Sequence, residues 1–227
     1  MSSTIFMGLV LVFAVALLIG AIYVIGKLLG NFSPSQRKVN ADLKAMQEKL
    51  EPVISKLVPW EREEMELFSL NQTDQVVEKG LVDSARGVFT SIYHEPMLAY
   101  AYKDYVTLGK KKDALLYAKT ALHEYVYRIK GDEIKVMADG TAIGVIRSDG
   151  TMYAPGRKNK AIASVKRNPN ELLLPVLVGD REVAAITNPA NTSQPNPRAF
   201  DLISDDITPD EEKIFLSLAI LEIISQN

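Results

Sequence analysis

The stretch Ile214–Ile224, IFLSLAILEII, is apolar on almost every side of the helix that it would form. A helix at a protein surface keeps a polar face, so this helix is expected to be buried. Its eleven residues are about half of the roughly 20 that a helix needs to cross a bilayer. We therefore expect it to lie inside protein, with the rest of the chain organised around it.

The residues before this stretch contain a clear helix start. Thr208 is a good N-cap, Pro209 suits the first helical position, and Glu211 can reach back to complete a capping box. The sequence therefore predicts a central helix over residues 209–225.

The middle of the chain is typical of β-structure, because short runs rich in Val, Ile, Tyr and Thr alternate with turn residues. Hairpin turns are indicated at Gly131-Asp132, Asp139-Gly140, Asp149-Gly150 and Gly179-Asp180, where Gly and Asp tolerate positive φ. Strands are predicted near 66–70, 87–93, 97–105, 114–120, 123–130, 133–138, 141–147, 151–154, 160–167, 171–178, 181–187 and 198–204. Residues 72–84 are ambiguous and are compatible with a short helix.

These strands favour a mainly β fold, an antiparallel barrel of about 12 strands around the terminal helix. Closing the sheet removes its edges, and a barrel of this many strands is too wide for its own side chains to fill. The terminal helix is the available plug, and burying each large apolar side chain is worth about 1.5–3 kcal/mol. The competing fold, an open sandwich with the helix on one face, would need a polar stripe, and Ser217 and Glu222 form only a thin one.

The amino-terminal stretch Ile5–Gly26 is 22 residues long and carries no charge. As a helix it would be about 33 Å long, enough for the hydrocarbon core of a bilayer. A cleaved signal peptide would have a basic start and a shorter apolar run, whereas Met1–Thr4 carry no basic side chain. We predict a transmembrane anchor over residues 1–30, crossing the membrane once.

The charges that flank this span predict its orientation. No basic residue precedes it, and the basic residues that follow closely are Lys27, Arg37, Lys38, Lys44 and Lys49. The positive-inside bias then places the N-terminus outside and the C-terminal domain in the cytoplasm. Glycosylation sequons occur at Asn31, Asn71 and Asn191. They would be used only in a eukaryotic lumen, so the inverted topology stays open.

Residues 31–60 are expected to form a juxtamembrane amphipathic helix. Its apolar residues, spaced by four and three, are Val39, Leu43, Met46, Leu50, Val53 and Leu57. Pro52 would interrupt this helix unless a new one starts there. The stripe would pack on the following domain or the bilayer surface, or it would join copies of the chain into an oligomeric stalk.

The element order resembles the tubby-like superfamily, of the phospholipid scramblase and LURP-one-related type, over about residues 65–227. The residues that carry the resemblance are the meanders TAIGVIRSDGTMYA (141–154) and REVAAITN (181–188), then Phe200-Asp201-Leu202, an acidic segment and the apolar helix. The resemblance implies that residues 61–227 form a barrel of about twelve strands closed around a central hydrophobic helix. It also implies contact with phospholipid, because tubby domains hold phosphoinositide headgroups with basic residues.

The chain departs from the scramblase pattern in several ways. It lacks cysteine, and with it palmitoylation sites, disulfides and zinc–thiolate sites, and it also lacks a proline-rich region. The acidic residues Asp201, Asp205, Asp206 and Asp210 only loosely echo the calcium segment of scramblases. They lack the loop glycine and paired ligands of a calcium site, so we expect them to cap the helix and to be solvated. No metal and no cofactor are predicted.

The sequence contains no recognisable catalytic arrangement. The two histidines, His94 and His123, lie outside any metal-ligand spacing, and there is no Walker loop, dinucleotide-binding glycine motif or nucleophile elbow. Lys and Arg number 26 against 28 Asp and Glu, which argues against a nucleic-acid partner held by bulk charge. We therefore predict a binding module and not an enzyme.

Basic loops are the best candidate binding sites. The candidate lipid-binding residues are Lys110, Lys111, Lys112, Arg157, Lys158 and Lys160, and a further basic pair is Lys166-Arg167. Basic residues beside a bilayer are attracted to anionic headgroups by about 1 kcal/mol each. The alternative is that these lysines only keep hairpin loops soluble.

The favoured hypothesis is a single-pass membrane protein whose cytoplasmic barrel contacts anionic phospholipid or a protein partner at the membrane surface. The first alternative is a homo-oligomeric scaffold assembled through the juxtamembrane helix. The second is scramblase-like lipid transport, for which neither calcium ligands nor a second span are visible in the sequence.

Overall fold

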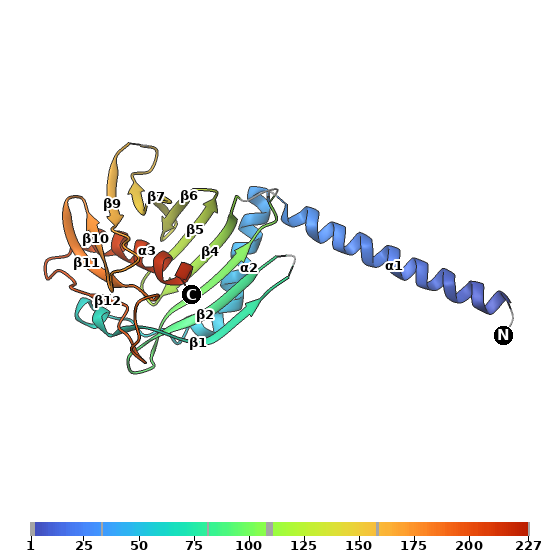
Figure 1. The fold of residues 1–227 in the computed structure, drawn as a ribbon, viewed down its shortest axis with the longest axis horizontal. Helices are drawn as coiled ribbons and strands as arrows, with labels where there is room; N and C mark the ends of the chain where they lie inside the picture. The colour runs from blue at the N-terminus through green and yellow to red at the C-terminus, as the bar shows by residue number, and fades with distance from the viewer. Residues whose placement is uncertain (1–2, 33, 81, 108–110, 158, 227) are drawn as a thin grey trace.

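The computed structural model describes residues 3–32, 34–80, 82–107, 111–157 and 159–226 (Figure 1). Side chains at 3–11, 23, 27–30 and 226 lie outside this description. The helices are α1 (Ser3–Asn31), α2 (Gln36–Ile54) and α3 (Pro209–Gln226), with one 3₁₀ helix, η1 (Arg62–Leu67). The strands are β1 (Phe68–Glu78), β2 (Ser84–Ser91), β3 (Pro96–Asp104), β4 (Asp113–Thr120), β5 (Glu124–Lys130), β6 (Glu133–Ala138), β7 (Thr141–Arg147), β8 (Thr151–Tyr153), β9 (Ala161–Val165), β10 (Leu173–Val178), β11 (Arg181–Thr187) and β12 (Phe200–Asp201).

The strands form one antiparallel sheet in which each strand pairs with its neighbours in the sequence, from β1 to β12. The two ends of this sheet meet. The N–H of Ala199 donates to the carbonyl of Phe68 at 2.8 Å, and the N–H of Leu70 donates to the carbonyl of Pro197 at 3.0 Å. Only these few hydrogen bonds join the two ends in the described residues, so the sheet forms a nearly closed barrel. The predicted mainly β fold with a 12-stranded antiparallel barrel is confirmed.

Each predicted strand corresponds to a strand of the structure, but the first and last differ in length. Residues 66–70 were predicted as a strand, yet η1 occupies their first two positions, and β1 continues to Glu78 through the region that was compatible with a helix. The predicted strand 198–204 is reduced to Phe200–Asp201. Leu202, directly after it, has a positive φ of 53°, which ends the extended backbone.

Helix α3 lies inside the barrel, as its sequence predicts. Every residue from Phe215 to Ile223 is buried, so the helix has no solvent face over this stretch. Its start also follows the prediction. The N–H and hydroxyl of Thr208 both donate to Glu211 Oε2, at 2.8 and 2.9 Å, and the N–H of Glu211 donates to Thr208 Oγ1 at 3.3 Å. The open sandwich is therefore excluded.

Helix α2 packs on the outside of the barrel, against β3 and β4. Val39, Met46 and Leu50 are buried there against outward-facing residues such as Ala99 and Leu115. This explains why β4 is buried at consecutive positions: one face lines the barrel and the other lies under α2. The helix passes Pro52 and ends at Ile54, so the proline does not split the helix and lies in its last turn.

The buried carboxylate of Asp42 ties α2 to β3. It accepts from Lys38 and Lys103 at 3.0 and 2.9 Å, and from the Tyr105 hydroxyl at 3.0 Å. Burial alone would raise the pKa of Asp42, but Lys103, Lys38 and Tyr105 together lower it below its usual value. Val39, Met46 and Leu50 of the apolar stripe of α2 therefore pack on the barrel of the same chain.

The antiparallel order gives the barrel two ends, because successive turns alternate between them. We call the α1 end the one that holds the β1–β2, β3–β4, β5–β6, β7–β8 and β9–β10 connections, since the β3–β4 connection touches the base of α1. The far end holds the β2–β3, β4–β5, β6–β7, β8–β9 and β10–β11 connections. Helix α3 begins at the far end, where Lys213 pairs with Asp139 of the β6–β7 turn at 3.0 Å. It finishes at the α1 end, where Glu222 meets Arg167.

Candidate functional site

The base of α1 is fastened to the β3–β4 connection. The N–H of Val106 donates to the carbonyl of Asn31 at 2.9 Å, and Phe32 and Val106 form an isolated parallel bridge. The side chain of Asn31 is buried. This connection also carries Lys111 and Lys112, so these two lysines lie near the chain that leaves α1.

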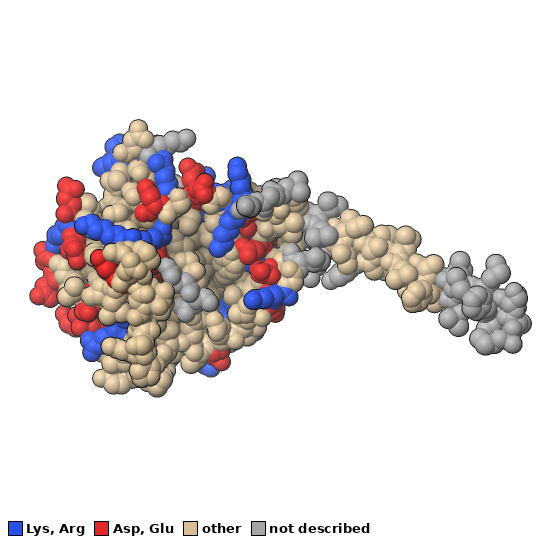
Figure 2. Space-filling view, in the orientation of Figure 1, with Lys and Arg blue, Asp and Glu red and all other residues tan. Residues whose placement is uncertain are grey.

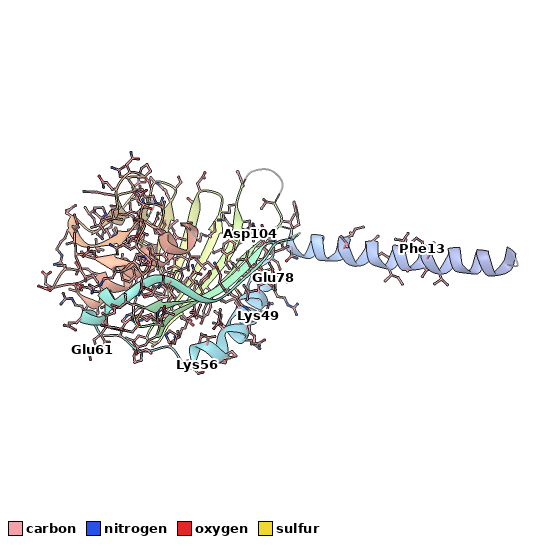
Figure 3. The ribbon with its side chains drawn as sticks, turned by 60° about the horizontal axis from the view of Figure 1, so that its bottom comes forward. Phe13, Lys49, Lys56, Glu61, Glu78 and Asp104 are labelled. Carbon is pink, nitrogen blue, oxygen red and sulfur yellow. The ribbon has the colours of Figure 1, made fainter. Side chains whose placement is uncertain are left out.

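Helix α1 projects from the barrel with no other element beside it (Figure 1). Its large apolar side chains between Val12 and Ile25 that the structure describes are 41–69% exposed. Figure 3 shows Phe13 far from the barrel, while Glu78 and Asp104 lie near the base of α1. Among the described residues, no helix is both long and apolar enough to cross a membrane. The side chains at 5–11 and 23 of the predicted span lie outside that description.

A surface basin of about 700 Å³ lies at the α1 end. Its basic lining residues are Lys111, Lys112, Lys130 and Arg147, and Phe32 also lines it. Within the described part of the chain, none of the three lysines forms an ion pair. Lysines that are not paired with carboxylates are available to an anionic ligand.

Acidic residues also line this basin, so its charge excess is small. Asp113 is paired with Arg128, whereas Asp132 and Glu133 of the β5–β6 hairpin are exposed. Figure 2 shows basic and acidic side chains interspersed over one face of the barrel, and neither kind on the described part of α1. The basin can therefore hold one anionic group near its lysines, but it is not a broad basic surface.

The candidate lysines and arginines do not form one face. Lys111 and Lys112 lie at the α1 end, whereas Arg157 and Lys160 lie in the β8–β9 connection at the far end. There the N–H of Arg157 donates to the carbonyl of Ala154 at 3.1 Å in an exposed turn. Lys110 and Lys158 lie outside the described residues.

Sequence reasoning missed Lys130 and Arg147, which the fold brings to the basin from β5 and β7. Lys130 precedes the predicted Gly131-Asp132 turn, and that turn lies two hairpins after the lysine-bearing loop. Counting turns along a meander would have placed both at one end, because alternate turns share an end.

In the basic pair Lys166-Arg167, Arg167 has a structural role and is not a surface cation. Arg167 donates to the buried carboxylate of Glu222 at 2.9 Å and to the carbonyl of Ser148 at 2.8 Å. Glu222 is only 2% exposed, so this arginine supplies the positive charge that a buried carboxylate needs. The charged residue of the thin polar stripe of α3, Glu222, therefore has an ion-pair partner.

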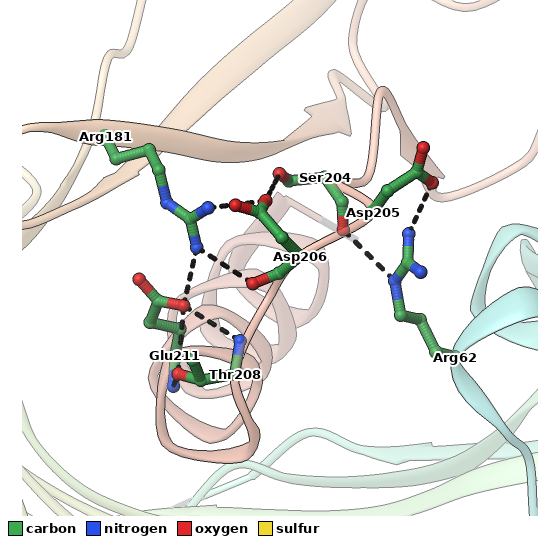
Figure 4. Close-up of polar contacts among 7 residues, drawn as sticks. All are labelled: Arg62, Arg181, Ser204, Asp205, Asp206, Thr208 and Glu211. Carbon is green, nitrogen blue, oxygen red and sulfur yellow. Dashed lines mark hydrogen bonds and ion pairs between the residues drawn. The ribbon is translucent and has the colours of Figure 1, made fainter.

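Two arginines from other parts of the chain, Arg62 and Arg181, bind the acidic segment before α3 (Figure 4). Arg62 donates to Asp205 Oδ1 at 2.8 Å and to the carbonyl of Ser204 at 3.1 Å. Arg181 pairs with Asp206 Oδ1 at 2.5 Å and with Glu211 Oε2 at 2.7 Å. The hydrogen bond from Ser204 and the pairing with Arg181 lower the pKa of Asp206. These acids hold the entry of α3, and the described residues contain no group that could hold a metal ion.

The histidines lie at turns of the far end. His94 has a positive φ of 66° between β2 and β3, and the His123 Nδ1 lies 2.8 Å from Asp139 Oδ2. Asp139 also accepts from the Glu124 N–H at 3.0 Å and from Lys213. Burial would raise the pKa of Asp139, but the Glu124 N–H, Lys213 and His123 lower it to about 2. This cluster joins two turns to the start of α3.

Comparisons with known protein families, characterised proteins and solved structures give no match for this chain.

Proposed function

We propose that this protein is a single-pass membrane-anchored binding module, and not an enzyme, whose barrel contacts anionic phospholipid through the basin at its α1 end. The observation that carries the proposal is the contact of Val106 with Asn31, which fixes the lysine-bearing loop at the base of the apolar helix. If α1 enters the bilayer, this end of the barrel is the one nearest the headgroups.

Electrostatics supports a modest affinity. Each lysine near an anionic surface contributes about 1 kcal/mol, and Lys111, Lys112 and Lys130 have no carboxylate partner among the described residues. The anchor supplies the rest, because a tethered domain meets the surface at a high effective concentration. The resemblance of about residues 65–227 to the tubby-like superfamily agrees with a phospholipid ligand.

The anchor itself rests on the uncharged run Ile5–Gly26 and on the exposed apolar side chains of α1. Basic residues only on the C-terminal side favour a cytoplasmic barrel. Because the chain has no cysteine, a single Asn159→Cys substitution gives a background-free test. A membrane-impermeant maleimide should label this residue only after cells are opened. Labelling of intact cells would contradict the orientation.

Flotation with vesicles tests the lipid contact. The chain from Asn31 onward keeps α2 and the barrel, and it should float with phosphatidylserine vesicles, not with phosphatidylcholine alone, and less at high salt. Changing Lys111, Lys112 and Lys130 to Ser should abolish flotation. The matched control, Arg157→Ser with Lys160→Ser at the far end, should float normally. If the unchanged chain fails to float with anionic vesicles, the lipid proposal fails and a protein partner replaces it.

A further inference from the structure

A second groove, of about 520 Å³, lies between α2 and the outer face of β4–β6. Lys130 and Glu133 line both this groove and the basin, so the two are continuous. Pro34 and Gln36 line its other side, directly after the base of α1. The groove therefore starts at the basin and runs away from α1 along the side of the barrel.

The floor of the groove is apolar. Its apolar lining residues are Val39 and Leu43 of α2, Leu115 of β4, Val126 of β5 and Met137 of β6. Met137 is 40% exposed, although residues on the outer face of an antiparallel sheet are usually polar. Helix α2 covers β3 and β4 but leaves this outward-facing part of β5 and β6 open.

The charged residues lie at the rim. Lys130 and Glu133 stand where the groove meets the basin. Lys135 and Glu124 line the groove further along, Glu124 accepts from the Tyr117 hydroxyl, and Arg128 is paired with Asp113. An apolar channel with a free cation at one end is complementary to an amphiphile that has one anionic head and a long apolar tail. The volume also falls within the roughly 300–1,000 Å³ range of small-molecule sites.

We propose that the groove takes one acyl chain of an anionic phospholipid whose phosphate lies at Lys130 in the basin. This inference rests on the proposed function and adds that the barrel holds an individual lipid by its tail. The bilayer is the source, because the groove opens beside Phe32 and Pro34 at the base of α1. Affinity then depends on the acyl chain, whereas a contact with headgroups alone does not.

Photo-crosslinking of the full chain tests this directly. The protein is placed in nanodiscs of phosphatidylcholine and phosphatidylserine in which the phosphatidylserine carries a diazirine at the end of one acyl chain. After irradiation, adducts are mapped by mass spectrometry. We expect adducts on α2, β5 and β6 around Leu43, Val126 and Met137, besides those on α1. Adducts confined to α1 would overturn the proposal.

Two variants and one control make the result specific. Met137→Trp fills the groove, and Met137→Gln keeps the side-chain length but removes the apolar contact; each should reduce groove adducts at least tenfold while those on α1 persist. Leu122→Trp, at a 57% exposed residue of the β4–β5 turn, is the matched control and should leave the adducts unchanged. Undiminished groove adducts in both Met137 variants would also overturn the proposal.

Vesicle flotation of the chain from Asn31 onward, as described for the proposed function, separates the two proposals. If only the acyl-chain site is wrong, no adducts form in the groove, but flotation of the chain from Asn31 onward with anionic vesicles still depends on Lys111, Lys112 and Lys130. If the unchanged chain does not float at all, the proposed function fails, and the acyl-chain site fails with it.

Discussion

Replacing Phe215 with Ala should destabilise the barrel more than almost any other single change, because this ring joins the central helix to the seam of the sheet. Phe215 is fully buried and packs edge-on against Phe200 of β12, with 5.1 Å between ring centroids. Phe200 stacks on Phe68 of β1 at 5.0 Å. These rings span the short contact between β12 and β1, so they add to the few hydrogen bonds that close the barrel there.

The expected loss follows from this burial. Removing a fully buried phenylalanine ring costs about 3–5 kcal/mol in total. For a domain of this size, each kcal/mol lowers the melting temperature by about 2–4 °C, which gives a loss of about 6–20 °C. Phe215→Leu keeps most of the volume and should lose less than about 1.5 kcal/mol.

Urea unfolding of the chain from Asn31, followed by circular dichroism, measures these differences. The slope of free energy against urea concentration should be unchanged, because the same surface is exposed on unfolding. Leu122→Ala, at an exposed turn, should stay within about 0.5 kcal/mol of the unchanged chain. A loss below about 1 kcal/mol for Phe215→Ala would refute the reasoning that α3 is a tightly packed plug.

Three further changes test other parts of the account. Leu50→Ser should lower the free energy of unfolding by about 2–5 kcal/mol without changing the molar mass in light scattering, because the stripe of α2 packs on its own barrel; dissociation of an oligomer would instead restore the stalk hypothesis. Thr208→Ala should lower the free energy of unfolding, measured by thermal unfolding, by about 1 kcal/mol, because it removes the N-cap of α3. An unchanged free energy of unfolding would show that the capping box does not stabilise the fold. The pKa of Asp139 is about 2 in the fold and 3.8 ordinarily. The ionised carboxylate therefore stabilises the fold above pH 3.8, and this stabilisation is lost as the pH falls from 3.8 towards 2. Asp139→Asn should therefore be less stable than the unchanged chain at neutral pH, by less than about 1 kcal/mol because the site is exposed, and the gap should close in acid; a gap independent of pH would contradict this assignment.

The interior of the molecule could be predicted from the sequence because its signals are local. The apolar run from Phe215 to Ile223 has no side to show to water, and its capping box at Thr208 and Glu211 is a pattern within four residues. The central hairpins follow from Gly and Asp at positive φ, as at Asp139 and Gly140. These features depend on neighbouring residues alone, so no tertiary information was needed.

The ends of the sheet could not be predicted in the same way. Strand β1 extends to Glu78 because β2 pairs with it, although Gln72–Glu78 has little apolar alternation of its own. Strand β12 is short because Leu202 turns away, and its pairing with the β1 side is decided by closure of the barrel. Tertiary contacts outweigh local propensity in such strands.

The candidate site was predicted only in part, because it gathers residues from distant hairpins. The loop with Lys111 and Lys112 was visible as a cluster in the sequence, but Lys130 and Arg147 join it only through the meander. Conversely, Arg157 and Lys160 looked equivalent to that loop and lie at the other end of the barrel. Arg167 looked like a surface cation, and its partner Glu222 is 55 residues further along the chain.

The most direct test of the central claim is to measure which end of the barrel faces the bilayer. Because the chain has no cysteine, a single fluorophore can be placed by Asp132→Cys in the β5–β6 turn or by Asn159→Cys in the β8–β9 connection of the full chain in nanodiscs. A quencher attached to lipid headgroups should strongly quench the label at residue 132, more so when phosphatidylserine is present, and leave the label at residue 159 bright. Equal quenching at both positions, or stronger quenching at residue 159, would contradict the proposal that the α1 end of the barrel contacts anionic lipid.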